Sequence, residues 1–335
     1  MREQTASKFS PAGHNVAAPN RGYSYLAFAT RAGVGLLVIG FLLWKYDARP
    51  VLRILGRENL EYFVATVAIY VAGQVMSAWR WQLLAAVVGV RARFSDFLGY
   101  YFVGLFTNLF VPGLLGGDAL RAVYLGRRTH RLGEAVASVV ADRGTGLIAL
   151  FWLAALMAVL IPSALAPPII KAIVLAGAAA LAIVLVAPLG AMILPHLPRL
   201  LRRALGVVHP YLHRPLSMLP GFSLSFLLQV SLGMAQWILA RGLGLPQPLA
   251  VFLLCVPIAN VAAGLPVTLN GLGVRETAYL VLFGMAGMAR EDAIALGLLW
   301  FAATMLGGLT GAIAFAFTDF PEKQGSTGAE RRVDP

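Results

Sequence analysis

Long, uninterrupted apolar runs restrict most strongly how this chain folds. A membrane-spanning helix needs ~20 apolar residues, and six runs approach or exceed that length: Leu26–Trp44, Tyr62–Trp79, Ala135–Ile161, Ile169–Leu194, Leu216–Ala240 and Ala293–Phe317. These runs are continuous rather than alternating, which favours helices over a membrane β-barrel. At 59% hydrophobic residues and 13% charged residues, a soluble protein of 335 residues has no interior large enough to bury this apolar surface. The sequence therefore predicts an all-α polytopic membrane protein with about six full spans.

The positive charge lies mainly in loops and tails. The formal net charge is +12, and positive-inside bias together with anionic lipid headgroups explains it better than a nucleic acid partner does. The loops 80–93, 127–131 and 195–215 carry most of the Arg residues, so we expect them to be cytoplasmic. The uncharged loop 162–168 is then outside, and the polar tails 1–24 and 319–335 are both cytoplasmic. The basic segment Lys45–Arg57 opposes this topology, which places it outside.

Two apolar pieces cannot cross the membrane once if these loops lie where the charges put them. The piece at about 96–126 joins two cytoplasmic loops, and the piece at 249–286 must also return to the side from which it came. Each is therefore predicted to be a re-entrant helical hairpin, and the two enter from opposite sides as an inverted repeat. Each carries an Asn, a Pro and spaced Gly residues; the predicted backbone breaks are Pro112, Gly116, Gly117, Pro266, Gly271 and Gly273. Opposed discontinuous helices near the midplane are typical of transporters.

The first candidate site is the break Thr107–Arg121. A helix that begins near Gly117 directs free N–H groups and its dipole toward an anion, with Asn108 beside it. Arg121 then adds a bidentate contact to phosphate. The alternative is a tight turn in which Asp118 caps the helix and pairs with Arg121.

Two further groups of charges lie at membrane depth. Asp142 is about ten helical residues from the cytoplasmic side, which is ~15 Å into a ~30 Å core, where an unpaired charge is costly. Neighbouring side chains on a helix point about 100° apart, so Asp142 and Arg143 need not pair with each other, and one of them is free to pair with a hairpin residue. A structural ion pair and a transport role remain open alternatives. The third group is Asn270, Arg275 and Glu276, again just after a Gly-rich break.

Other features favour packing. We interpret the two tryptophans of Trp79-Arg80-Trp81 as a membrane–water boundary. Packing or lipid contact best explains the aromatic cluster Tyr100, Tyr101, Phe102 and Phe106, and packing also explains the lone Cys255. The sequence has no P-loop, zinc-protease or nucleophile-elbow motif. We expect no metal, no cofactor and no catalytic residues.

The ordered set of these motifs resembles the membrane region of the lysylphosphatidylglycerol synthase/flippase family, over roughly residues 25–318. The residues that carry the resemblance are Trp79-Arg80-Trp81, Asn108, Pro112, Gly116-Gly117-Asp118, Arg121, Asp142-Arg143, Pro266 and Asn270 to Glu276. The resemblance implies translocation of an anionic or aminoacylated lipid across the bacterial cytoplasmic membrane. Full-length synthases carry a soluble aminoacyltransferase domain that this chain has no room for, so we expect a separate enzyme to make the lipid.

The leading interpretation is thus a flippase for a phospholipid or a polyprenyl-phosphate-type lipid, with no nucleic acid partner. The headgroup path is expected to contain Asp118, Arg121, Asp142, Arg143, Arg275 and Glu276. The alternatives are a membrane-embedded transferase acting on a lipid phosphate, or an accessory subunit of a lipid-modifying complex. The sequence leaves the lipid, the direction of transport, the energy source and the oligomeric state open.

Overall fold

The computed structural model describes residues 60–109, 115–193, 209–213, 215–264 and 274–318. Within these ranges the secondary structure is helical and contains no strand. Five helices are long and apolar enough to cross a membrane: α3 (Leu60–Val87), α6 (Leu132–Leu160), α7 (Pro167–Ile193), α10 (Leu219–Gly242) and α13 (Arg290–Phe317). The prediction of an all-α polytopic membrane protein is confirmed. The predicted span Leu26–Trp44 lies outside the described residues.

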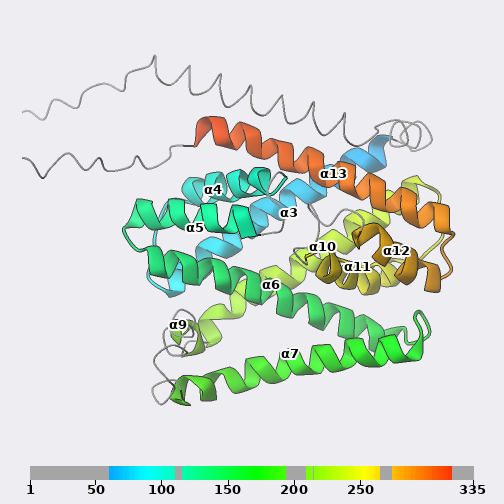
Figure 1. Ribbon diagram of the computed structural model, residues 1–335, viewed down its shortest axis with the longest axis horizontal. Helices are drawn as coiled ribbons and strands as arrows, with labels where there is room; N and C mark the ends of the chain where they lie inside the picture. The colour runs from blue at the N-terminus through cyan, green and yellow to red at the C-terminus, as the bar shows by residue number, and fades with distance from the viewer. Residues whose placement is uncertain (1–59, 110–114, 194–208, 214, 265–273, 319–335) are drawn as a thin grey trace, which may run out of the picture.

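Four shorter helices pair within the bundle. They are α4 (Phe94–Thr107), α5 (Leu115–Thr129), α11 (Leu249–Ala263) and α12 (Val274–Met285). At 1.5 Å per residue each is about 18–22 Å long, which is too short for a ~30 Å hydrocarbon core. In Figure 1, α4 and α5 lie side by side in one half of the molecule's long axis, and α11 and α12 lie together in the other half. Two remaining pieces, α9 (His209–Leu212) and a 3₁₀ turn at Pro215–Met218, precede α10.

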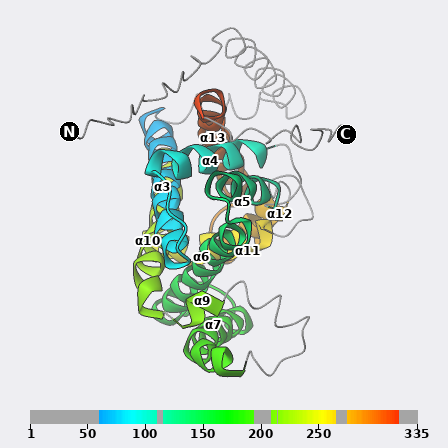
Figure 2. The ribbon, with the colours of Figure 1, turned by 90° about the vertical axis from the view of Figure 1, so that its left-hand side faces the viewer.

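The long helices lie at the edges of the bundle, except for α6, which lies inside it and contacts α3, α5, α7, α10 and α11. Seen along the bundle in Figure 2, α13 lies at one edge and α7 at the opposite edge, next to α6, while α3 and α10 run together along one side. The α4–α5 pair lies between α13 and α6.

The contact between α4 and α5 depends on glycine. A Cβ atom added to Gly117 would collide with the carbonyl oxygen of Gly104 and would lie 2.7 Å from Oδ1 of Asn108. That Asn108 oxygen accepts a hydrogen bond of 2.8 Å from the backbone N–H of Gly117, so it satisfies a donor that the first turn of α5 leaves without a helical partner. Gly116 and Gly117 were predicted to break the helix, and this was wrong: α5 begins at Leu115 and both lie in its first turn. The other predicted breaks, at Pro112, Pro266, Gly271 and Gly273, lie outside the described residues.

Two apolar cores lie at opposite ends of the bundle. One surrounds Phe63 and Tyr70 of α3, and the other surrounds Trp81 and Leu84 further along the same helix. Between them a band of buried polar side chains crosses three helices at mid-height: Gln74, Ser77 and Arg80 on α3, Asp142 and Thr145 on α6, and Ser225 and Gln229 on α10. The helices that the sequence predicts as simple spans therefore carry a polar layer in the middle of the molecule.

Trp79-Arg80-Trp81, interpreted as a membrane boundary, contributes two of its three side chains to the interior of the bundle. Helix α3 continues to Val87, and only Trp79 is exposed, at 50%. Trp81 is fully buried and its indole N–H donates to Oγ of Ser138 at 2.9 Å. Arg80 points into the bundle, where a carboxylate compensates its charge.

Candidate functional site

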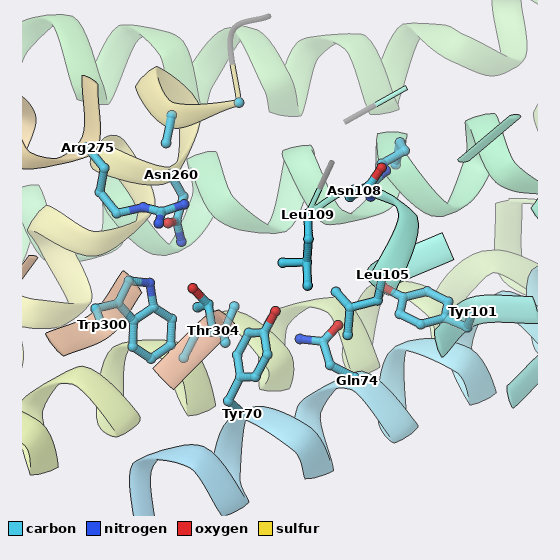
Figure 3. Close-up of a pocket in the computed structure, with 14 residues that line it drawn as sticks. Tyr70, Gln74, Tyr101, Leu105, Asn108, Leu109, Asn260, Arg275, Trp300 and Thr304 are labelled. Carbon is cyan, nitrogen blue, oxygen red and sulfur yellow. The ribbon is translucent and has the colours of Figure 1, made fainter. Parts of the chain in front are cut away.

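A cavity of about 220 Å³ lies between α4 and the residues just after it on one side and the α11–α12 pair on the other. Figure 3 shows Asn108 and Leu109, at the end of α4, on one side, and Asn260 of α11 and Arg275 of α12 on the other. Tyr70 and Gln74 from α3 and Trp300 and Thr304 from α13 close it further. We call this space the central cavity. Its full lining is Tyr70, Gln74, Tyr101, Leu105, Asn108, Leu109, Arg143, Leu232, Asn260, Ala263, Gly264, Arg275, Trp300 and Thr304.

Arg143 is the charged group of α6 that faces this space. Its side chain is 44% exposed, although it lies eleven residues inside a membrane-length helix. Nε and Nη2 of Arg143 donate to the two carboxylate oxygens of Asp118, at 2.5 and 2.7 Å. This bidentate pair also lines a smaller pocket of about 30 Å³ with Asn108, Gly117 and Arg121.

Asp142, the neighbour of Arg143, points away into a closed environment. It is fully buried, and its Oδ1 accepts a 2.7 Å hydrogen bond from Nε of Arg80. Its Oδ2 accepts a 2.9 Å hydrogen bond from Nη2 of Arg121. Arg80 extends the contact to α10, because its Nη1 donates to Oγ of Ser225 at 3.0 Å. Asp142 and Arg143, which the sequence analysis left free to pair separately, have different partners in the structure, and each contacts a residue of α5.

Arg121 joins the two ion pairs into one network. Its Nε lies 3.1 Å from Oδ1 of Asp118, while its guanidinium group lies 5.0 Å from the ring centroids of both Trp81 and Tyr101. The side chain is only 2% exposed. We call Arg80, Asp142, Arg121, Asp118 and Arg143 the ion-pair network; it connects α3, α6 and α5.

The network has more positive than negative charge. Among its side chains, three guanidinium groups face two carboxylates, and Arg275 adds a further cation in the wall of the central cavity. Within the described side chains, the site is therefore electrostatically suited to an anion. Carboxylates that already bind two guanidinium groups each are poorly placed to bind a metal ion or an amine as well.

The two halves of the network differ in their access to the central cavity. Asp142, Arg80 and Arg121 are closed off and hold α3, α5 and α6 together. In the Arg143–Asp118 pair, the Asp118 side chain is largely buried at 12% exposed, whereas the Arg143 side chain is 44% exposed and lines the central cavity. The adjacent residues Asp142 and Arg143 of α6 thus lie in different environments, one closed and one lining the central cavity.

Of the predicted site residues, the structure brings six around the central cavity and the network: Asn108, Asp118, Arg121, Asp142, Arg143 and Arg275. Asn270 lies outside the described residues. Glu276 belongs to α12, but its side chain is not among those described.

Sequence reasoning missed several residues of the site. Arg80 was assigned to a boundary, and Tyr101 to packing, whereas Tyr101 contacts Arg121 and lines the central cavity. A basic residue within an apolar helix was the available signal for Arg80. Asn260 was considered only as the Asn that the second predicted hairpin shares with the first, and not as a site residue. No local pattern indicated Tyr70, Gln74, Trp300 or Thr304.

Comparison with known proteins gives the family. The model of the lysylphosphatidylglycerol synthase TM region matches residues 28–311. The chain belongs to this family. A curated relative, the UPF0104 membrane protein MJ1595 of Methanocaldococcus jannaschii, is 29% identical over 115 residues, and the alignment covers 32% of this chain and 34% of that protein.

The match to the lysylphosphatidylglycerol synthase TM region family covers every described residue of the site. The matched residues run from before α3 to within α13, so they include both short helix pairs and every residue of the ion-pair network. Membership is consistent with a lipid-related role in a membrane.

Proposed function

We propose that this protein moves an anionic lipid, or a lipid-linked intermediate with a phosphate headgroup, between the leaflets of the cytoplasmic membrane. The observation that carries the proposal is the position of Arg143. Its guanidinium group is half exposed to a polar cavity in the middle of the bundle, on a helix long enough to cross the membrane. A cation at such depth marks a substrate path more often than it serves packing.

The headgroup phosphate would bind by replacing Asp118 at Arg143. The planar guanidinium group can donate two hydrogen bonds to phosphate in the same bidentate geometry that it now uses for the carboxylate. Asp118 would keep its second partner, Arg121, 3.1 Å away, so it is not left as an isolated buried charge. Arg275 and the amides of Asn108 and Asn260 lie in the walls of the same cavity. An aminoacylated headgroup would in addition place its amine near the released carboxylate.

The two short helix pairs would act as opposed re-entrant hairpins. Their lengths support this, since α4, α5, α11 and α12 fall short of the hydrocarbon core. Their placement in opposite halves of the bundle, with Asn108 and Asn260 facing one cavity, supports an inverted arrangement around a central site. We place the basic loops, and with them the base of the α4–α5 hairpin and both termini, on the cytoplasmic side.

Leaflet exchange in proteoliposomes tests the proposal. Fluorescent analogues of phosphatidylglycerol and phosphatidylcholine would be reconstituted with wild-type protein and with Arg143→Gln, and the fraction accessible to an impermeant quencher followed over time. We expect the wild-type protein to exchange the anionic lipid faster than phosphatidylcholine, and Arg143→Gln to lower the exchange rate of the anionic lipid by at least about tenfold. Loss of one bidentate contact worth ~1.5–3 kcal/mol is sufficient for this effect. An exchange rate that is the same for both lipids and unchanged by Arg143→Gln would contradict the proposed path.

A membrane-embedded transferase acting on a lipid phosphate is the second candidate. It would need carboxylates free to bind a metal ion or to act as a base. Asp142 and Asp118 are each already bonded to two arginines, which favours translocation over transfer. Metal-dependent conversion of the lipid in the same proteoliposomes would favour the transferase instead.

A further inference from the structure

A second polar space lies at the other end of the α4–α5 hairpin. It is a groove of about 390 Å³, formed where the α3–α4 loop meets the connection between α5 and α6. Its lining includes four arginines, Arg91, Arg93, Arg128 and Arg131, and one acid, Asp96. We call this the basic groove. Residues about 40 positions apart in the sequence converge on it, so it is not a local run of charge.

Arg131 forms one wall and is already engaged. Its Nη1 donates to the carbonyl oxygen of Gly89 at 2.9 Å, and its Nε and Nη2 lie 3.1 and 3.0 Å from Oε1 of Glu134. Gly89 has φ of +76°, and an added Cβ would lie 3.0 Å from Nη1 of Arg131. The backbone at Gly89 thus permits the close approach that joins the two loops.

Asp96 compensates little of the remaining charge. Its Oδ2 accepts the backbone N–H of Arg93 at 3.2 Å, at the start of α4. The same oxygen lies 3.9 Å from Nε of Arg128, whose side chain is 56% exposed, and such a pair contributes little. With Glu134 included, four guanidinium groups around the groove face two carboxylates. Arg91, Arg93 and Arg128 therefore supply a net positive wall.

We propose that the basic groove binds a phosphate group, carried by an anionic lipid headgroup or by a soluble phosphate ester, before the headgroup reaches the central cavity. Arg128 and Asp118 lie on one helix, α5, ten residues and about 15 Å apart. The basic groove and the central cavity thus lie at opposite ends of the α4–α5 pair. The role in loading rests on the proposed translocation, whereas phosphate binding by the groove does not.

A matched pair of arginines on α5 provides the test. Arg128 lines the groove, while the adjacent and exposed Arg127 is not part of its lining. Arg128→Gln, Arg93→Gln and Arg127→Gln each remove one charge, and any general attraction to anionic surfaces falls by the same amount in all three. The variants would be made in full-length protein carrying Arg143→Gln, which removes the contribution of the central cavity, and held in phosphatidylcholine nanodiscs.

Binding would be titrated with dioctanoyl phosphatidylglycerol and, separately, with glycerol 3-phosphate. We expect Arg128→Gln and Arg93→Gln to weaken binding about tenfold, the scale of one lost charge-assisted contact, and Arg127→Gln to change it less than about twofold. Binding of both probes assigns the groove to a phosphate ester in general, and binding of the lipid alone assigns it to a headgroup. Equal loss in Arg127→Gln and Arg128→Gln, or no binding of either probe, would overturn the proposal. If Arg128→Gln and Arg93→Gln weaken binding selectively but the wild-type protein exchanges no lipid, phosphate binding by the groove is supported and the proposed translocation is contradicted.

Discussion

Asp142 and Arg143 are adjacent in the sequence but meet different environments. The carboxylate of Asp142 is enclosed by Arg80 and Arg121, each side chain less than about a tenth exposed. The guanidinium group of Arg143 lies against the central cavity. Because their directions differ by about 100° on the helix, one helical turn carries both a buried ion-pair anchor and the residue for which we propose a contact with the substrate.

Asp142→Asn should strongly destabilise the protein, because it leaves Arg80 buried without its anion and leaves Arg121 with Asp118 alone. Removal of one partner of a buried ion pair typically costs about 3–5 kcal/mol. Thermal unfolding in detergent would be followed for Asp142→Asn and for the control Asp118→Asn. Asp118 pairs with the more exposed Arg143, so a distinctly smaller shift is expected there. Equal shifts would show that the two halves of the network do not differ as described.

At the scale of elements, the α4–α5 hairpin is held by a contact that tolerates no side chain. Gly117 packs directly on the backbone at Gly104, and Asn108 bonds to its N–H. The same interface positions Asp118, the next residue, toward Arg143. The packing of α4 on α5 and the position of the Asp118–Arg143 ion pair therefore depend on one glycine.

Gly117→Ala should separate α4 from α5 and displace Asp118. Overpacking of this kind costs about 1–3 kcal/mol, and we expect both a lowered unfolding midpoint and slower lipid exchange. Gly144→Ala on α6 is the matched control, since an added Cβ there meets nothing within 4 Å. It should be neutral or stabilising by up to ~1 kcal/mol. Normal exchange by Gly117→Ala would contradict the proposed role of this contact.

Sequence patterns predicted the elements better than the partners of their side chains. Apolar run length indicated the long helices, and Gly116 and Gly117 indicated the start of α5 to within two residues, since α5 begins at Leu115. The contact of Arg80 with Asp142 joins positions 62 residues apart, and no local pattern specifies it. Trp79 and Trp81 of α3 suggested a boundary because the polar band inside the bundle cannot be recognised from the sequence of one helix. Angular separation on a helix is a local property, and it allowed different partners for Asp142 and Arg143 without identifying them.

At the scale of the whole molecule, two apolar cores enclose a polar middle. The cores stabilise the ends of the bundle, and the central cavity lies between the short helix pairs. An arrangement in which each hairpin belongs mainly to one core gives the two hairpins independent support. This is the architecture expected if one half rocks against the other around a fixed site.

Cysteine labelling tests the opposed hairpins. In a Cys255→Ala background, whose native thiol is buried, single cysteines would replace Ser95, Arg127, Pro246 and Ala289, all exposed. An impermeant maleimide applied to vesicles of either orientation should label Ser95→Cys and Arg127→Cys from one side, and Pro246→Cys and Ala289→Cys from the other. Labelling of Ser95→Cys and Arg127→Cys from opposite sides would mean that this segment crosses the membrane.

The most direct test of the central claim is to capture a lipid headgroup inside the central cavity. A photoreactive amino acid would replace Leu105, which lines the cavity, or, as a control, Leu147, which is exposed on the surface of α6. After irradiation in vesicles, mass spectrometry identifies the attached lipid and the attached atoms. We predict attachment to the headgroup of phosphatidylglycerol at position 105, lost with Arg143→Gln, and attachment only to acyl chains at position 147. Acyl-chain attachment alone at position 105, or equal capture of phosphatidylcholine headgroups, would contradict an anionic headgroup path through this cavity.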